Sequence, residues 1–293
     1  MSSGLFAIST IRKRPPHFSH FKMSTANTAG VVGYISALIF SLAGLVAEGQ
    51  DRPGIVVERI QLPRRSELAI GDAVATIVRV DLRRYRFTFL TQRDGAARPL
   101  DRWVREHHLA GAINAGMFLH GGRPCGFVQL RGTVLNDRRP ARFQSVVAFD
   151  PIGQAASFAV GGTGCGADLD ETRRHFGSLL QGTRALVDCH GTPTNWRTGR
   201  YSSASLGVDG EGRAVLVHVR TPYRMNVLAR MLAAPELGIR GLVFMEGGPE
   251  ASLIVNAEGQ RVALMGSWED GFHEADDLHE LWDLPNVVGF ESR

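Results

Sequence analysis

Residues 203–219 carry a β-hairpin signal that limits the folds open to this chain. Two runs rich in apolar and β-branched residues, 203–208 and 214–219, flank Asp209-Gly-Glu-Gly-Arg213. Aspartate and glycine in this position are typical of a tight turn between antiparallel strands. We therefore expect two strands here that pair as a hairpin.

The following segment predicts a helix and then a buried strand. Apolar side chains at Val227, Leu228, Met231 and Leu232 share one face of a helix over 222–234, which Pro235 ends. The short apolar run from Leu242 to Met245 is typical of a buried strand. Together with the hairpin, this order predicts a single α+β domain, in which a mixed β-sheet packs with a few helices. The regular βα alternation of a Rossmann fold or a barrel is not present in the sequence.

The rest of the chain adds strands and two short helices. Leu100, Trp103 and Val104 recur at helical spacing, and Asp168-Leu-Asp-Glu171 gives a second helix an acidic first turn. Runs of apolar, β-branched and aromatic residues predict strands at 55–62, 73–82, 84–91, 110–113, 126–130 and 145–150, and a further apolar run spans 179–187.

The N-terminus resembles an export signal. Four basic residues between Arg12 and Lys22 precede the uncharged stretch 29–47, and small residues at Ala47 and Gly49 could mark a cleavage point. An uncleaved membrane anchor over 29–47 is the alternative, and Met23 is a second candidate start. We expect residues 1–49 to be a signal peptide or anchor, residues 50–293 to be the functional domain, and the protein to be periplasmic or secreted.

The charge balance argues against a nucleic-acid partner. The chain holds 33 Lys and Arg against 29 Asp and Glu, and residues 1–49 contain four of the basic residues and one of the acidic ones. The remaining 29 basic and 28 acidic residues nearly cancel. A near-neutral domain has no overall field to attract a polyanion. We expect a membrane contact only through an uncleaved N-terminal segment.

The sequence predicts no cofactor or zinc site. Cys165 and Cys189 could pair and leave Cys125 free, or all three cysteines could be reduced and buried. No cysteine and histidine spacing is typical of zinc. The acidic cluster between Glu269 and Asp283 could bind calcium, but it lacks the regular ligand spacing of a calcium loop, so we expect a solvated face.

Two apolar strands end in polar residues and glycines. Met245 is followed by Glu246-Gly-Gly-Pro249, and Ile113 by Asn114-Ala-Gly-Met-Phe118. Glycines let the chain turn sharply and let another molecule approach the backbone. We expect the two strand ends to share one rim of a pocket. Alternatively, each is an ordinary turn, with a solvated Glu246.

The order of several short motifs resembles the phosphodiester glycosidase family. The motifs, within roughly 75–290, are Ile113–Phe118, Pro124–Gly126, Leu180–Gln181, Ser205–Asp209 and Met245–Gly248 with Ser252. Asp188-Cys-His-Gly191, Ser267–Phe272 with Asp276–Asp277, and Leu284–Gly289 are similar to a bacterial branch. Family enzymes tend to carry an aspartate where this chain has Glu246, and an arginine nearer the Ala204 strand than Arg200.

The resemblance implies cleavage of a sugar C1–O bond in a phosphodiester. A phosphate monoester leaves readily, so the site mainly needs a carboxylate for the oxocarbenium-like sugar and donors for the phosphate. Glu246 is the first candidate carboxylate. Asp188 is the second, with His190 as a proton carrier, although both could simply cap a local turn.

The other candidate residues would bind substrate. Asn114 would hydrogen-bond sugar hydroxyls or a facing loop, Gly116, Gly247 and Gly248 would allow close approach, and Phe118 would offer an apolar platform. Arg200 and Ser203 are candidate phosphate donors, Arg200 being otherwise a surface arginine. Ser252 would donate to substrate or cap the next segment. Glu250 could be a second carboxylate, although an exposed glutamate after Pro249 is the expected alternative.

The sequence therefore leaves two hypotheses. The first is an exported hydrolase that cleaves a glycosyl phosphodiester in an envelope or extracellular glycan. The second is a catalytically weak or inactive protein of the same fold that binds a carbohydrate or phosphoglycan.

Overall fold

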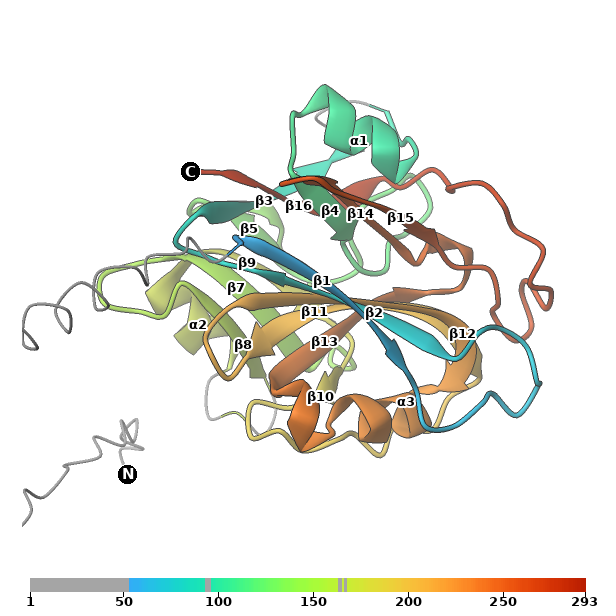
Figure 1. Cartoon of the computed structure of the whole chain (residues 1–293). Helices are drawn as coiled ribbons and strands as arrows, with labels where there is room; N and C mark the ends of the chain where they lie inside the picture. The colour runs from blue at the N-terminus through green and yellow to red at the C-terminus, as the bar shows by residue number, and fades with distance from the viewer. Residues whose placement is uncertain (1–52, 93–95, 163–164, 166–167) are drawn as a thin grey trace, which may run out of the picture. The chain divides into compact units, whose positions relative to one another are not determined.

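Antiparallel strands with alternating apolar residues build the sheets of this protein. The computed structural model describes residues 53–92, 96–162, 165 and 168–293, and within them three β-sheets form one α+β domain (Figure 1). The six-stranded sheet has the order β1 (Ile55–Gln61), β2 (Val74–Val80), β12 (Ala214–Arg224), β11 (Arg200–Asp209), β13 (Ile239–Gly247) and β10 (Ala185–Val187).

Two five-stranded sheets complete the domain. The second sheet has the order β15 (Gln260–Met265), β14 (Ser252–Ala257), β4 (Gly111–Asn114), β16 (Asn286–Ser292) and β3 (Tyr85–Thr91). The third has the order β6 (Thr133–Asn136), β5 (Val128–Leu130), β9 (Phe176–Gly182), β7 (Ser145–Pro151) and β8 (Phe158–Gly162).

One hydrophobic core joins the sheets. Leu206 and Val243 of the first sheet, Ile113 of the second, and Val147 and Leu180 of the third belong to the same buried cluster. These residues alternate along their strands with residues that face the other side, because successive side chains of a strand point to opposite faces. The inner faces of all three sheets therefore meet in a single core.

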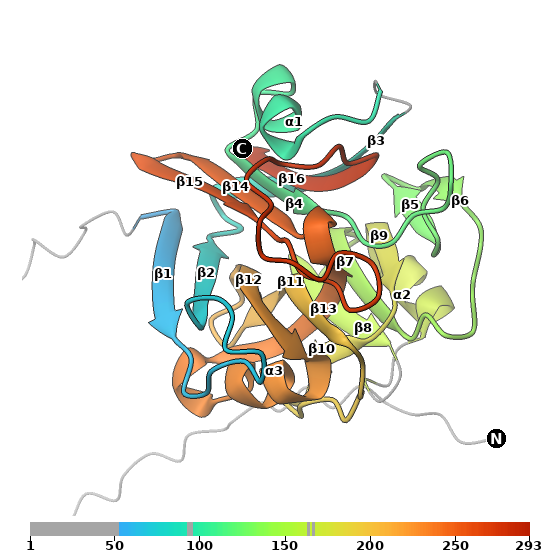
Figure 2. The same cartoon turned by 90° about the vertical axis from the view of Figure 1, so that its right-hand side faces the viewer.

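The outer face of each sheet packs against one helix in the described part of the chain. Helices α1 (Leu100–Glu106), α2 (Leu169–His175) and α3 (Met225–Leu232) carry this role. Figures 1 and 2 show α1 over β4, β14 and β16, and α3 below the six-stranded sheet. Trp103 of α1 and Leu228 of α3 are fully buried in the two outer clusters. Asp168 caps α2, its carboxylate accepting from the Glu171 N–H at 2.8 Å.

The α+β class predicted from the sequence is confirmed, but the mixed sheet is wrong. Every pair of neighbouring strands in the described residues is antiparallel. The helix after the hairpin suggested a crossover between parallel neighbours. Helix α3 does connect β12 to β13, which run the same way, but β11 lies between them and is antiparallel to both.

Cys165 and Cys189 form a disulfide with their Cα atoms 5.7 Å apart, and Cys125 is free and buried. Of the two alternatives that the sequence left open for the cysteines, the structure therefore contains the one with a disulfide.

The predicted signal or anchor, and its boundary at residue 49, lie outside the described residues. None of the described helices is both long and apolar enough to cross a membrane.

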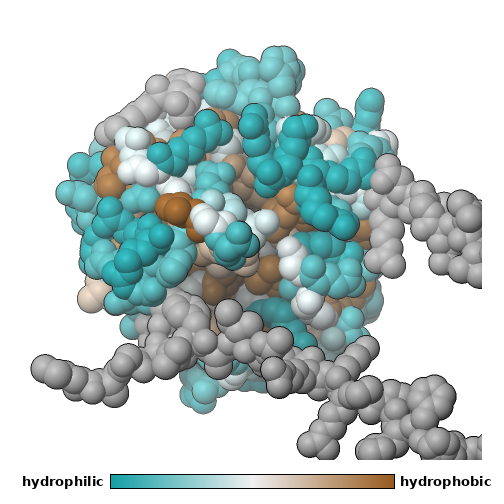
Figure 3. All heavy atoms as spheres, turned by 90° about the vertical axis from the view of Figure 1, so that its left-hand side faces the viewer, coloured by the Kyte–Doolittle hydropathy of each residue, from teal (hydrophilic) through white to brown (hydrophobic). Residues whose placement is uncertain are grey.

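The face on the side of α2 shows no single apolar patch in its visible part. Hydrophobic side chains there are interspersed with hydrophilic ones (Figure 3). Ile152, between β7 and β8, is one large apolar side chain that is exposed.

Candidate active site

Strands β13 and β4 end side by side, although they belong to different sheets. Gly116, just after β4, has a φ of +82°, and a Cβ atom on it would lie 3.3 Å from the Met245 carbonyl oxygen. Glycine is favoured at such a φ because other residues are strained there. The two strand ends therefore lie side by side, as expected from the sequence. We call the edge formed by residues 114–116 and 245–248 the rim, and Glu246 is part of it.

Three carboxylates gather at this rim. Glu246 is the second-last residue of β13, and Glu250 follows in the single turn Gly248–Glu250. Glu269 comes from the segment after β15, and its Oε2 lies only 2.6 Å from where a Cβ on Gly248 would be. All three side chains are partly buried. Among the described residues, none of them forms an ion pair with an arginine or histidine.

The environment raises the pKa of all three carboxyl groups. Burial raises the pKa of Glu246 well above its ordinary value, and the nearby Glu250 and Glu269 raise it further. Burial, together with Glu269, raises the pKa of Glu250 to about 7. Burial also raises the pKa of Glu269. Since like charges in contact resist ionising together, the cluster can hold protonated and ionised carboxyls at the same pH.

Asn114 and Ser252 place unused polar atoms beside this rim. Asn114 Oδ1 accepts a hydrogen bond of 3.1 Å from the Ser252 N–H, which ties the end of β4 to the start of β14. Both residues are almost fully buried. Within the described part of the chain, Asn114 Nδ2 and Ser252 Oγ have no hydrogen-bond partner. A buried polar atom without a hydrogen-bond partner destabilises the folded protein, and a hydrogen bond to a polar ligand would remove this penalty.

The arginines near the rim differ in their availability. The Nε of Arg200 donates to Asp270 Oδ2 at 2.9 Å, so the expected phosphate donor is already part of an ion pair. Arg138 and Arg142 lie near Cys125. Burial and Glu246 raise the pKa of that thiol, while the two arginines lower it. Their charges therefore act on the same region as the Glu246 carboxylate.

Asp188 and His190 are not brought to Glu246. Val187 pairs with Leu242, and the antiparallel chain continues from there toward the start of β13, whereas Glu246 lies four residues, about 13 Å, from Leu242 toward the other end of that strand. Asp188 Oδ1 accepts from the N–H groups of His190 at 2.9 Å and Thr192 at 2.8 Å. The turn-capping alternative is therefore the one that the structure contains.

The remaining predicted residues are near the rim or support it. Ser203 is buried and pairs with Gly247 in the β11–β13 ladder. Gly247 lies against Tyr201, and Gly248 takes a φ of +69° where Glu269 approaches. Phe118 is partly buried and forms an isolated bridge with Pro124.

Sequence reasoning favoured exposed positions for two of the three carboxylates, although it named Glu250 as a possible second carboxylate. Glu250 is partly buried rather than exposed, because Pro249 and the preceding glycines turn the chain back toward the rim. Glu269 was placed on a solvated face, yet Tyr201 and Glu269 form an isolated antiparallel bridge that brings it inward. Pro249 was a usable local signal for Glu250, whereas the bridge depends on residues far apart in the chain.

The family model of phosphodiester glycosidase matches residues 107–291, more than half of the chain. This chain belongs to the phosphodiester glycosidase family. The match includes all three rim carboxylates and the Asn114–Ser252 pair. No curated protein matches the chain.

Solved structures share the fold of this phosphodiester glycosidase family member. The catalytic domain of zebrafish N-acetylglucosamine-1-phosphodiester alpha-N-acetylglucosaminidase, auto-inhibited by its pro-peptide, is similar with a TM-score of 0.59 and 15% identity. The similarity covers 83% of this chain and 85% of that one. A hypothetical protein from Synechocystis is similar with a TM-score of 0.54 and 15% identity over 82% of this chain and 62% of its own. At these identities the likeness concerns the fold alone.

Metal binding has no support in the described residues. No group of three or more His, Cys, Asp or Glu side chains there is arranged to hold a metal ion. The groups that the rim itself offers are carboxyl, amide, hydroxyl and guanidinium groups.

Proposed function

We propose that this protein is an exported hydrolase that cleaves a glycosyl phosphodiester, a diester of a sugar 1-phosphate, in an envelope or extracellular glycan. The observation that carries the proposal is the group of three partly buried carboxylates, Glu246, Glu250 and Glu269, on a rim without a neutralising ion pair among the described residues. Family membership supports the reaction class.

The reaction needs an acid and a base that coexist near neutral pH. Water forms a new bond to the sugar C1, the C1–O electron pair leaves with the phosphate monoester, and a carboxylate takes the proton of the water. Glu246, which holds its proton most strongly, would donate a hydrogen bond to the departing phosphate or to a sugar hydroxyl. Glu250 or Glu269, when ionised, would accept the proton from water.

The other groups would orient the substrate. Asn114 Nδ2 can donate to a sugar hydroxyl, and Ser252 Oγ can donate or accept. Arg138 and Arg142 are candidate partners of the phosphate, because their charges reach the Glu246 region. No redox cofactor is proposed, since no electrons are gained or lost by the substrate.

Export is part of the proposal. The Cys165–Cys189 disulfide supports it, because disulfides persist mainly in oxidising compartments. N-terminal sequencing of the protein recovered from the cell envelope or medium would test it. A new N-terminus between residues 47 and 51 supports cleavage, and an intact N-terminus in the membrane fraction supports the anchor.

The activity can be tested with N-acetylglucosamine 1-(p-nitrophenyl phosphate) and related sugar 1-phosphodiesters in ¹⁸O-water. We expect the label in the hydroxyl on C1 of the released sugar, because the C–O bond breaks. Glu246→Gln should lower kcat at least about a hundredfold. Glu236→Gln, which changes an exposed glutamate outside the rim, is the matched control. Label in the phosphate would contradict the mechanism, and saturable binding without turnover would support the binding-protein alternative.

A further inference from the structure

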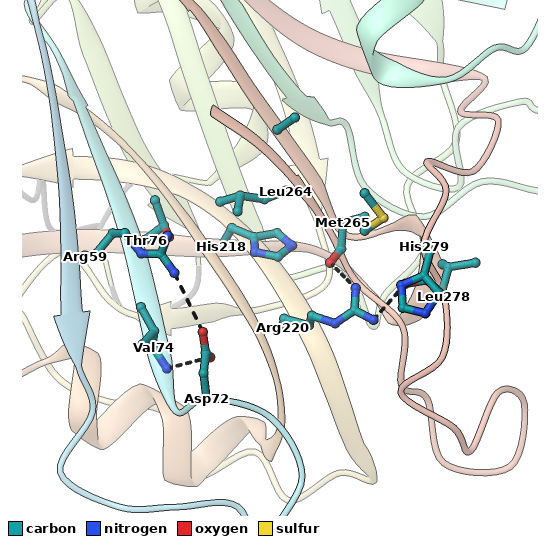
Figure 4. A pocket seen from close by; sticks show the side chains of 11 residues that line it. Arg59, Asp72, Val74, Thr76, His218, Arg220, Leu264, Met265, Leu278 and His279 are labelled. Atoms are coloured by element: carbon teal, nitrogen blue, oxygen red, sulfur yellow. Dashed lines mark hydrogen bonds and ion pairs between the residues drawn. The ribbon is translucent and has the colours of Figure 1, made fainter. Parts of the chain in front are cut away.

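A pocket lies between the six-stranded sheet and β15, and none of the three rim carboxylates lines it. Its volume is about 270 Å³, and none of the predicted site residues lines it. Figure 4 shows Leu264 near Thr76 and His218, and Arg220 beside Met265 and Leu278. Its volume is close to the lower end for ligand pockets, which suits one sugar ring better than an oligosaccharide.

His218 supplies an unused acceptor to this pocket. Its side chain is 3% exposed, and it pairs directly with Thr76 across β2 and β12. His218 Nε2 is 3.1 Å from the Ala251 carbonyl oxygen. A carbonyl can only accept, so Nε2 carries the proton and Nδ1 of the neutral ring is an acceptor. Within the described residues, no hydrogen bond to Nδ1 is found.

The imidazole stays neutral under ordinary conditions. Burial lowers the pKa of His218 to about 4, and Arg220 lowers it too, whereas its bond to Ala251 and the charge of Asp72 act in the opposite direction. A neutral acceptor calls for a ligand that donates a hydrogen bond. Sulfate, carboxylates and the dianion of a phosphate monoester have no proton to donate to it, and inorganic phosphate would bring a charge that this pocket does not neutralise.

The charges around the pocket are largely balanced. Arg220 Nε donates to Asp276 Oδ1 at 2.7 Å, and its other nitrogens donate to the carbonyls of Met265 at 3.2 Å and Leu278 at 2.8 Å. Arg59 lies 3.8 Å from Asp72 at the exposed edge. The fixed guanidinium of Arg220 retains N–H groups beyond these three bonds. The pocket therefore offers hydrogen-bond donors and an acceptor without a strong excess of positive charge.

We propose that this pocket binds one uncharged sugar residue. A sugar hydroxyl would donate to His218 Nδ1, the Thr76 hydroxyl would exchange a hydrogen bond with a neighbouring hydroxyl, and the C–H face of the ring would pack on Leu264 and Leu278. This combination of apolar walls and mixed donors and acceptors is complementary to a polyhydroxyl ring. The site does not depend on the chemistry of Glu246.

The full chain labelled with ¹⁵N-histidine provides the test. The imidazole resonances are titrated with the methyl glycosides of glucose, galactose, mannose and N-acetylglucosamine, and separately with inorganic phosphate. The His218 signal is assigned by its loss in His218→Gln. We expect at least one glycoside, and not phosphate, to shift His218 Nδ1 in a saturable manner, as expected when an acceptor nitrogen gains a hydrogen bond.

Variants decide whether the shift comes from this pocket. Thr76→Val, which removes one hydroxyl at similar volume, should weaken binding about three- to tenfold. Leu264→Trp should fill the pocket and abolish the shift, whereas Arg261→Trp on the same strand, outside the pocket, should not. Circular dichroism checks the fold of each variant. Glu246→Gln should leave the glycoside-induced shift of the His218 signal unchanged, even if it abolishes hydrolysis.

The proposal is overturned by any of three results. No neutral glycoside shifts His218 saturably, or phosphate shifts it in their place, or folded Thr76→Val and Leu264→Trp bind the glycoside as the unchanged protein does. A loss of hydrolysis in Glu246→Gln tests the proposed reaction separately, so the two proposals can fail independently.

Discussion

At the scale of single residues, Glu250 should make stability depend on pH. Its pKa in the folded protein is raised from 4.5 to about 7, so the folded state binds more protons than the unfolded state between these values. The stability linked to Glu250 is fully present below pH 4.5 and is lost as the pH rises through 7. Glu250→Gln should therefore gain stability relative to the unchanged protein at pH 8, by on the order of 1–3 kcal/mol, and not at pH 4.

Urea unfolding at the two pH values measures this difference. Glu236→Gln, at an exposed position, controls for the loss of one negative charge. Equal effects of Glu250→Gln at pH 4 and pH 8 would show that the carboxyl is solvated in the folded protein.

Alanine variants of Ser252 and Asn114 should differ in stability, although both should weaken substrate binding. Ser252 Oγ has no partner among the described residues, so Ser252→Ala should leave the free energy of unfolding unchanged or slightly higher. Asn114 Oδ1 accepts from the Ser252 N–H, so Asn114→Ala should cost about 1–3 kcal/mol. Both variants should raise KM if they contact the sugar. Chemical unfolding and steady-state kinetics measure the two effects, and a clear loss of stability in Ser252→Ala would argue for a structural hydroxyl.

At the scale of elements, the disulfide should stabilise the segment that it closes, which contains α2, β9 and β10. Cys165 and Cys189 are 24 residues apart, and closing such a loop contributes about 3 kcal/mol in the chain-entropy model. The double variant Cys165→Ala with Cys189→Ala should lose about this amount in urea unfolding. Reducing agent should weaken the unchanged protein and leave the double variant as it is. If the reducing agent lowered the free energy of unfolding equally in both proteins, its effect would not come from the Cys165–Cys189 disulfide.

Local patterns predicted the elements far better than their partners. The hairpin of β11 and β12, the run of β13 and the helical spacing of α1 depend on residues close in sequence. Strands β14 and β15 were not predicted, although the sequence contains a turn signal between them, Glu258-Gly259. In the structure these two residues have φ values of +51° and +76°, as in a tight hairpin turn, which glycine favours. The placement of β4 between β14 and β16 has no such signal in the sequence, because it joins segments more than 130 residues apart.

The same distinction explains the candidate site. Glu246 and the glycines after it form a local motif that could be recognised, and Asn114 was found at the end of a similar strand. Glu269 reaches the rim only through the bridge to Tyr201, which no local pattern encodes. Asp188 was chosen for its residue type. The pairing of β10 with β13 carries the chain after Val187 toward the start of β13, away from Glu246.

At the scale of the whole molecule, the shared core should make the sheets of the described domain unfold together. Phe87 of the second sheet lies 5.3 Å from Phe158 and 6.2 Å from Phe149 of the third, measured between ring centroids, and 5.5 Å from Phe290 of its own sheet. Its side chain is buried, so Phe87→Ala removes contacts in two sheets at once.

We expect Phe87→Ala to cost about 3–5 kcal/mol through lost burial and a residual cavity. Phe272→Ala, at a ring that is 64% exposed, should change stability by less than about 0.5 kcal/mol. Urea unfolding followed by tryptophan fluorescence and by far-ultraviolet circular dichroism measures both. The two probes should give one coincident transition in each protein, because the sheets bury their inner faces in the same cluster. Separate transitions in Phe87→Ala would mean that one sheet keeps its structure without the others.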